Sequence, residues 1–437
     1  MGSNFPWSFI ALALACWGGP SVPAQEREAL TLSLDRAVSL ALEQSLNLQK
    51  NYMDIQNADR AAKNLWALVF PEISAGAGIS YRSPLFTDPG LQGDRQNFSY
   101  NGSLGITVQF SAALASSMRI LALAYQTQLL TYASARKQLE IQVAKTFYTL
   151  LTLKRNLTHW EEMQRLAELQ FERNQTAFAN GLISQRVLLQ SRLGAEAAKF
   201  SRLQAVSIYN RQLGEFLVLL GLEHDAEAVL VGSLAIERIE ADPEELILRY
   251  LAKRPDIISG RQTIERLELL SQRIALNARS PSLNLAAQWN GSGTGDSGFT
   301  DALSGSLSVR IPLDPWIPGG LSSQSIQTAR SEVEKARLDL KNTETQAKMA
   351  IYSLTGDLRT SWDSIEIARL RLETAERTYA LTEQGFKNGA VESLVLEDAR
   401  NALSLARRQL LEEELAYKTK ALDLAAALNI EWYAETL

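Results

Sequence analysis

Histidine and cysteine, the residue types most often found in catalytic and transition-metal sites, are scarce in this 437-residue chain. The two histidines, His159 and His224, cannot form a multi-histidine metal site on their own, and the single cysteine, Cys16, cannot form a disulfide within the chain. The glycine-rich run at 291–295 lies between two expected strands, with no helix after it to hold a phosphate. No nucleophile elbow is present. The sequence therefore argues against an enzyme and predicts neither a cofactor nor a metal.

The charge balance excludes a second class of function. Lys and Arg number 44 against 49 Asp and Glu, the net charge is -5, and no block of basic residues occurs. Nucleic acid is therefore not an expected partner. The length allows two or three domains and a large core.

The most informative local pattern is an Asn-Gly pair that occurs twice. Phe-Ala-Asn-Gly at 178–181 recurs as Phe-Lys-Asn-Gly at 386–389, each between very long helical patterns. The match continues downstream, where Val187, Leu188 and Arg192 correspond to Val395, Leu396 and Arg400. Glycine and asparagine tolerate the left-handed backbone that ends a helix. Each copy therefore predicts the tip of a long hairpin of two helices.

The whole chain is organised as two copies of one unit. The first structural repeat is expected at 25–222 and the second at 243–430, with a linker at 223–242 and a C-terminal tail at 431–437. Asp242-Pro243 at the end of the linker is a good helix start. In each repeat we expect a helix, two strands, a long helix and a returning helix.

The strands are predicted from a switch to alternating periodicity. They are expected at 71–83 and 101–112 in the first repeat, and at 281–291 and 303–313 in the second. One face is apolar and the other small or polar, and each strand has about the ten residues that a tilted strand needs to cross a bilayer. The connecting loops, 84–98 and 291–302, are rich in polar residues and glycine. Aromatic residues near the strand ends suggest an interfacial girdle: Tyr81, Phe98, Tyr100 and Trp289.

Four strands cannot close a barrel, and open sheet edges are not tolerated in lipid. The chain must therefore share strands with copies of itself, two copies giving eight strands and three giving twelve. The small residues on the polar face favour an open lumen. The alternative from the pattern alone is a small sandwich outside the membrane.

The helical part is dominated by two very long segments. Residues 114–180 contain neither glycine nor proline, which allows a helix of roughly 100 Å. The counterpart is expected at 321–388, and its pattern from Leu321 to Gln384 is broken only by Gly356. Returning helices are expected at 182–222 and 390–429, and a helical pattern runs from Leu34 to about residue 70. The long helices carry a coiled-coil-like apolar seam.

The N-terminus has the features of an export signal. Residues 1–24 read as a secretory signal peptide, with small residues before Gln25. Cys16, after Leu14-Ala15, is an alternative site of lipid attachment. No later stretch reaches the roughly 18 consecutive apolar residues of a membrane-spanning helix.

Taken together, these features resemble the TolC-like outer-membrane efflux proteins, and the resemblance covers nearly all of the chain after residue 24. It is carried by Leu34-Asp35-Arg36-Ala37, by the duplication, by the paired tips, and by Leu394 to Arg400 after the second tip. The resemblance implies a homotrimer, with a twelve-stranded barrel in outer-membrane lipid continued by an α-helical barrel across the periplasm of a Gram-negative-type bacterium. It also implies a passive duct that docks with a periplasmic adaptor and an inner-membrane pump, for efflux or for type I secretion.

The resemblance also assigns roles to residues. Asp398 matches the second aspartate of the family's constricting ring, whereas Val395 stands at the position of the first, and Glu397 is a substitute on another face of the helix. An acidic ring would favour cations in the throat. The resemblance places the adaptor at the tips, at Asn180, Gly181, Leu182, Ser184, Asn388, Gly389, Val391 and Glu392. The plainer interpretation of these eight residues is hairpin capping.

Two functions are left to distinguish. The first is an export duct, and the second is a soluble periplasmic coiled-coil scaffold with a four-stranded cap. A duct should fractionate with outer membranes as an SDS-resistant oligomer, whereas a scaffold should wash off.

Overall fold

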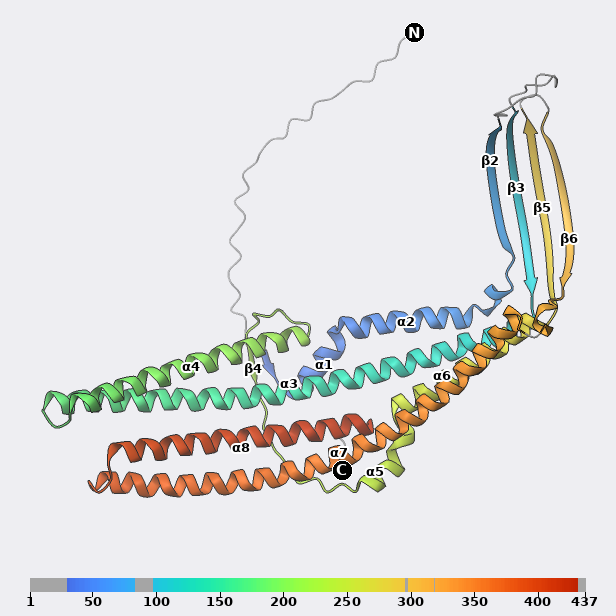
Figure 1. Cartoon of the computed structure of the whole chain (residues 1–437). Helices are drawn as coiled ribbons and strands as arrows, with labels where there is room; N and C mark the ends of the chain where they lie inside the picture. The colour runs from blue at the N-terminus through green and yellow to red at the C-terminus, as the bar shows by residue number, and fades with distance from the viewer. Residues whose placement is uncertain (1–29, 83–96, 295–297, 318, 431–437) are drawn as a thin grey trace, which may run out of the picture.

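The computed structural model describes residues 30–82, 97–294, 298–317 and 319–430. The molecule is elongated, with a four-stranded sheet at one end and two helical hairpin tips at the other (Figure 1). The expected signal peptide at 1–24, Cys16, the tail at 431–437 and most of the loop at 84–98 lie outside the described residues.

Each half of the chain contains two strands, a very long helix and a returning helix in the same order. In the first half these elements are β2 (Glu72–Arg82), β3 (Asn97–Phe110), α3 (Leu114–Ala179) and α4 (Gln185–Leu219). In the second half they are β5 (Ser282–Thr294), β6 (Thr300–Arg310), α7 (Leu321–Lys387) and α8 (Ser393–Leu428). The helix α7 is continuous through Gly356, as the helix predicted at 321–388 requires, because one glycine weakens a helix by only about 1 kcal/mol.

The helix that opens each half is broken, unlike the single helix expected from Leu34 to about residue 70. The first half has α1 (Leu34–Gln44), α2 (Leu46–Lys63) and η1 (Leu65–Leu68). Between α1 and α2, Ser45 is extended and its hydroxyl accepts a hydrogen bond from the Leu48 amide at 3.3 Å, which starts a new helix.

The second half is broken at the corresponding place. Its opening elements are α5 (Pro243–Tyr250), η2 (Leu251–Lys253) and α6 (Pro255–Arg279). Arg254 is extended, with ψ 137°, because the ring of Pro255 disfavours the helical conformation of the residue before it.

The four long strands form one antiparallel sheet in the order β2-β3-β5-β6. The register places apolar residues opposite one another across all four strands: Ile73 with Ile106, Leu104 with Trp289, and Leu285 with Leu307. The sheet therefore has one apolar and one small or polar face. The strand β3 begins four residues before the expected position, and β6 ends at Arg310 instead of 313.

The helical body is held together where the two halves meet. One core contains Phe147, Leu150 and Phe216, together with Leu32 and Leu230 from the parallel pair β1 (Leu30–Leu32) and β4 (Ala228–Leu230). The other core contains buried residues of α7 and α8, and linker residues pack against it. The segment 223–242 thus runs from one core to the other.

A tyrosine fixes this linker to α8. The Tyr417 hydroxyl donates to the Glu237 carbonyl at 2.8 Å and accepts from the Ile239 amide at 2.9 Å. Among the helices that the structure describes, none has an apolar stretch long enough to cross a membrane.

Candidate functional site: the hairpin tips and the seam between hairpins

The two hairpin tips have nearly the same backbone geometry. Both Gly181 and Gly389 have φ of 72°. After α3, the Leu182 amide donates to the Ala177 carbonyl at 2.8 Å; after α7, the Ala390 amide donates to the Gly385 carbonyl at 2.9 Å. These bonds close the helix ends in the Schellman manner, which requires the left-handed residue that glycine supplies.

Side-chain packing distinguishes the tips. A Cβ built on Gly181 or Gly389 would meet nothing within 4 Å, so glycine is needed there for its backbone conformation. A Cβ on Gly385 would lie 2.7 Å from a methyl group of Val391, so the second tip also needs glycine for space. At the first tip, Ala177 takes the place of Gly385.

The structure brings the eight predicted tip residues to one end of the molecule. Leu182 is the most prominent apolar one, with 75% of its surface exposed, and Val391 is half-buried because it packs on Gly385. The other six are exposed: Asn180, Gly181, Ser184, Asn388, Gly389 and Glu392. This end thus offers polar groups around an exposed leucine.

The two acidic candidates lie on different faces of α8. The Glu397 carboxylate lies against α4, with one oxygen 3.7 Å from the Cβ position of Gly194. Asp398 is exposed and has no ion pair within the described residues. Of the two, Asp398 is therefore better placed to face an aqueous space.

The two hairpins of one chain meet along α3 and α8. Lys145 forms an ion pair with Asp423, and His159 Nε2 lies 2.6 Å from Ser404 Oγ. Burial lowers the pKa of His159, the positive charges of Arg407 and Arg408 lower it further, and Glu162 opposes them. At this seam the neutral imidazole is therefore favoured.

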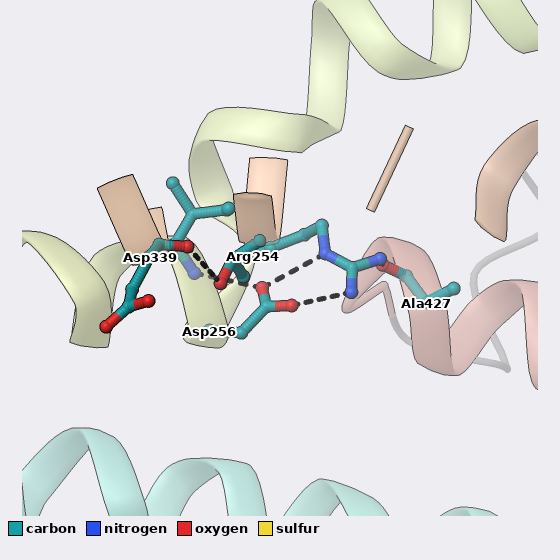
Figure 2. A network of polar contacts seen from close by, with 6 residues as sticks. Arg254, Asp256, Asp339 and Ala427 are labelled. Atoms are coloured by element: carbon teal, nitrogen blue, oxygen red, sulfur yellow. Dashed lines mark hydrogen bonds and ion pairs between the residues drawn. The ribbon is translucent and has the colours of Figure 1, made fainter. Parts of the chain in front are cut away.

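A further polar network lies within the second half of the chain, between the start of α6 and the end of α8 (Figure 2). Arg254 donates from Nε and Nη2 to the two carboxylate oxygens of Asp256, at 3.0 and 2.7 Å, and from Nη1 to the carbonyl of Ala427 at 2.7 Å. Burial would raise the pKa of Asp256, but the hydrogen bonds and the charge of Arg254 outweigh it, so this pKa is lowered. The network fixes the start of α6 to the end of α8.

Sequence reasoning missed these seam residues. His159 entered only as one of two histidines too few for a metal site, and Lys145, Ser404 and Asp423 were not singled out. The sequence signal for these residues would have been polar side chains at positions where the periodicity of α3 and α8 calls for apolar ones. One sequence does not show which helices are neighbours, so the signal could not be interpreted. In the ranges that the structure describes, no group of three or more His, Cys, Asp and Glu residues is placed to hold a metal ion.

This architecture defines a class of protein in which a four-stranded antiparallel sheet is joined to two long helical hairpins. The model of the outer membrane efflux protein family matches this chain at residues 37–218 and 246–429. The chain belongs to this family and is an outer-membrane efflux channel component that reaches into the periplasm.

Individual relatives agree with this assignment. The chain is 25% identical over 388 residues to the probable efflux pump outer membrane protein TtgC and to the antibiotic efflux pump outer membrane protein ArpC, both from Pseudomonas putida, covering 84% of this chain and 77% of each relative.

Solved structures confirm the predicted fold class. CusC superposes with a TM-score of 0.72 at 16% identity, covering 91% of this chain and 92% of that one. The CmeC outer membrane channel of Campylobacter jejuni gives a TM-score of 0.71 at 16% identity, covering 90% and 85%.

Proposed function

We propose that three copies of this chain form a closed, passive duct that carries small molecules out through the periplasm and the outer membrane. The observation that carries this proposal is the four-stranded sheet, which has one apolar face and two unpaired edge strands, β2 and β6. Unpaired backbone groups are too costly in lipid for such a sheet to remain open. When copies join edge to edge, each edge strand pairs with an edge strand of the next copy, and the closed ring has no unpaired strand.

The composition of the polar face supports three copies over two. Glycine and serine predominate there, at positions such as Ser74, Gly76, Gly78, Ser103 and Gly105. Eight strands leave an interior that side chains can fill, whereas twelve strands lined by small residues leave a water-filled lumen.

The helical region also has two complementary lateral faces. On α4, the face opposite α3 bears an exposed apolar stripe, consisting of Leu189, Leu193, Phe200 and Leu203. Phe200 and Leu193 have 69% and 71% of their surface exposed. Such a stripe at three-, four- and seven-residue spacing is typical of a surface that packs against another helix.

The matching face is a groove of about 470 Å³ between α7 and α8, lined by residues such as Leu370, Ala402 and Leu405. Ala402 lies roughly 160° round α8 from Ser404, which contacts α3 of the same chain. The hairpin of α3 and α4 (hairpin 1) thus covers one side of the hairpin of α7 and α8 (hairpin 2) in the same chain, and the groove on the other side accommodates α4 of the next copy. The hairpins then alternate around a ring.

The tips are the proposed docking site of a periplasmic adaptor, which connects the duct to an inner-membrane pump. Asp398 is the proposed acidic constriction, and the role of Glu397 is reduced because its carboxylate faces α4.

Relatives named for antibiotic and toluene efflux support small molecules as the cargo. The pump, not a wide duct, selects the cargo, and we assign the chain no catalytic step.

The proposal is tested by membrane fractionation, SDS electrophoresis without boiling, and conductance in planar bilayers. We expect an outer-membrane protein that migrates as an SDS-resistant trimer and conducts ions. A monomer in detergent that conducts no ions would refute the duct. Release from membranes by a carbonate wash would instead favour the periplasmic scaffold.

A further inference from the structure

The two edge strands of the sheet match one another in length and pattern. Strands β2 and β6 have 11 residues each and are outermost in the sheet order. In both strands the odd-numbered residues lie on the apolar face of the sheet and the even-numbered residues on the polar face. An antiparallel junction between β6 of one copy and β2 of the next can therefore continue both faces.

The polar face of the sheet has very few charges. Among the described residues of the four strands, only Glu72, Arg82 and Arg310 are charged on this face. Glu72 is the first residue of β2 and Arg310 is the last of β6, so both lie at the helical end of the sheet. Both are exposed, and neither has an ion pair within the part of the chain that the structure describes. The two unpaired charges have opposite signs and lie on opposite edges.

We propose that Arg310 of one copy and Glu72 of the next form an ion pair that fixes the register of the junction between copies. This inference rests on the proposed assembly. In this register Arg310 faces Glu72 and Thr300 faces Arg82, so all eleven residues of each strand are paired. A shift by two residues keeps the faces aligned but leaves two residues of each strand without a partner, and it separates the charges.

The geometry favours a specific contact. Directly opposite residues in an antiparallel pair have Cβ atoms about 5 Å apart, within reach of an arginine and a glutamate. The pair would lie on the polar, lumen-facing side at the helical end of the sheet, where water screens it and the paired strands hold the two charges opposite one another. Apolar residues then meet on the lipid face of the junction, Ile73 with Val309 and Ile79 with Leu303.

Cysteine pairs test the register directly. Ser74→Cys with Ser308→Cys should give covalent oligomers on non-reducing SDS gels after mild oxidation, because these residues face each other across the junction. Ser74→Cys with Ser306→Cys, and Ser80→Cys with Ser304→Cys, represent shifts by two residues in either direction and should crosslink poorly. Each single-cysteine variant serves as a control.

The outcomes separate this inference from the proposed function. If the unmodified protein forms a trimer but a shifted pair crosslinks best, or all three pairs crosslink equally, the register is overturned and the duct remains. If the unmodified protein forms no oligomer, the proposed function fails first.

Charge reversal tests the ion pair itself. Glu72→Arg and Arg310→Glu should each lower the temperature at which the SDS-resistant oligomer dissociates, and the double variant should recover most of the loss. Arg82→Glu, at the other end of β2, should leave that temperature nearly unchanged because no opposite charge faces it. Losses that simply add in the double variant would overturn the pairing.

Discussion

The two hairpins share one backbone design but carry different side chains at equivalent positions. Their tips have the same φ of 72° at Gly181 and Gly389, and an offset of 208 residues aligns the returning helices. At the aligned positions, α4 has Leu189, Leu193 and Phe200, whereas α8 has Glu397, Asn401 and Arg408. The fourth residue of the stripe, Leu203, is matched by Leu411, so three of the four stripe positions are apolar in hairpin 1 and polar in hairpin 2.

This difference follows the neighbours of each helix. In α8 that face lies beside hairpin 1 of the same chain, where Glu397 lies against Gly194 of α4. In α4 it has no cover within one chain, so its leucines and phenylalanine are exposed. Asp398 has its equivalent in Gln190, so the proposed acidic ring belongs to hairpin 2 alone. The two hairpins thus share a backbone design and differ in the side chains that the returning helices carry.

The largest effect is expected from the apolar stripe. Phe200→Asp should abolish the SDS-resistant trimer, because placing a charge where an aromatic ring packs removes about 3 kcal/mol or more from each interface. Lys199→Asp, one residue away and about 100° round the helix, is the matched control and should preserve the trimer. A stable trimer in Phe200→Asp would show that the stripe does not lie between copies.

Asp398 is expected to govern ions in the throat. Asp398→Ala should raise single-channel conductance and weaken block by multivalent cations roughly tenfold, because carboxylates near a pore axis contribute on the order of 1 kcal/mol or more to cation binding. Gln190→Ala, at the equivalent position of hairpin 1, should leave both unchanged. Unaltered conductance and block in Asp398→Ala would exclude it as a constriction.

Because the two tips share one backbone geometry, we expect equal losses of stability when their glycines are replaced. Gly181→Ala and Gly389→Ala should each destabilise the protein by about 1 kcal/mol, because alanine is strained at positive φ. Gly356→Ala, within α7 and with free space around it, should instead stabilise it by roughly 0.5–1 kcal/mol. Thermal unfolding in detergent measures the stability change of all three variants. Clearly unequal losses of stability for Gly181→Ala and Gly389→Ala would show that the two tips are not equivalent in the isolated protein.

The smallest effect concerns pH at the seam. His159 has a pKa below its ordinary 6.5, so the unfolded state binds more protons as the pH falls through 6.5, and stability decreases until the folded pKa is passed. We expect a loss of roughly 0.5 kcal/mol or less, because solvent screens a half-buried group. Denaturation measured between about pH 8 and pH 5 should show that the free energy of unfolding decreases as the pH falls. We expect this decrease in the native protein and in Ser404→Ala, but not in His159→Gln. An unchanged pH dependence in His159→Gln would assign it to groups other than His159.

Local sequence patterns predicted the parts of this molecule that depend on local physics. Alternation gave the strands, the absence of glycine and proline gave α3, and Asn-Gly gave the tips. The breaks at Ser45 and Arg254 were missed, although Pro255 was a sufficient signal for the second.

The sequence by itself determined which segments are helices and strands, which strand face is apolar and where each hairpin turns, because these depend on near neighbours in the chain. Only the tertiary structure decided that Glu397 faces α4, that His159 meets Ser404 across the seam, and that Glu72 and Arg310 occupy opposite sheet edges at the same end. These facts depend on contacts between residues distant in sequence. Periodicity identifies the face that a residue occupies, but not the element that covers that face.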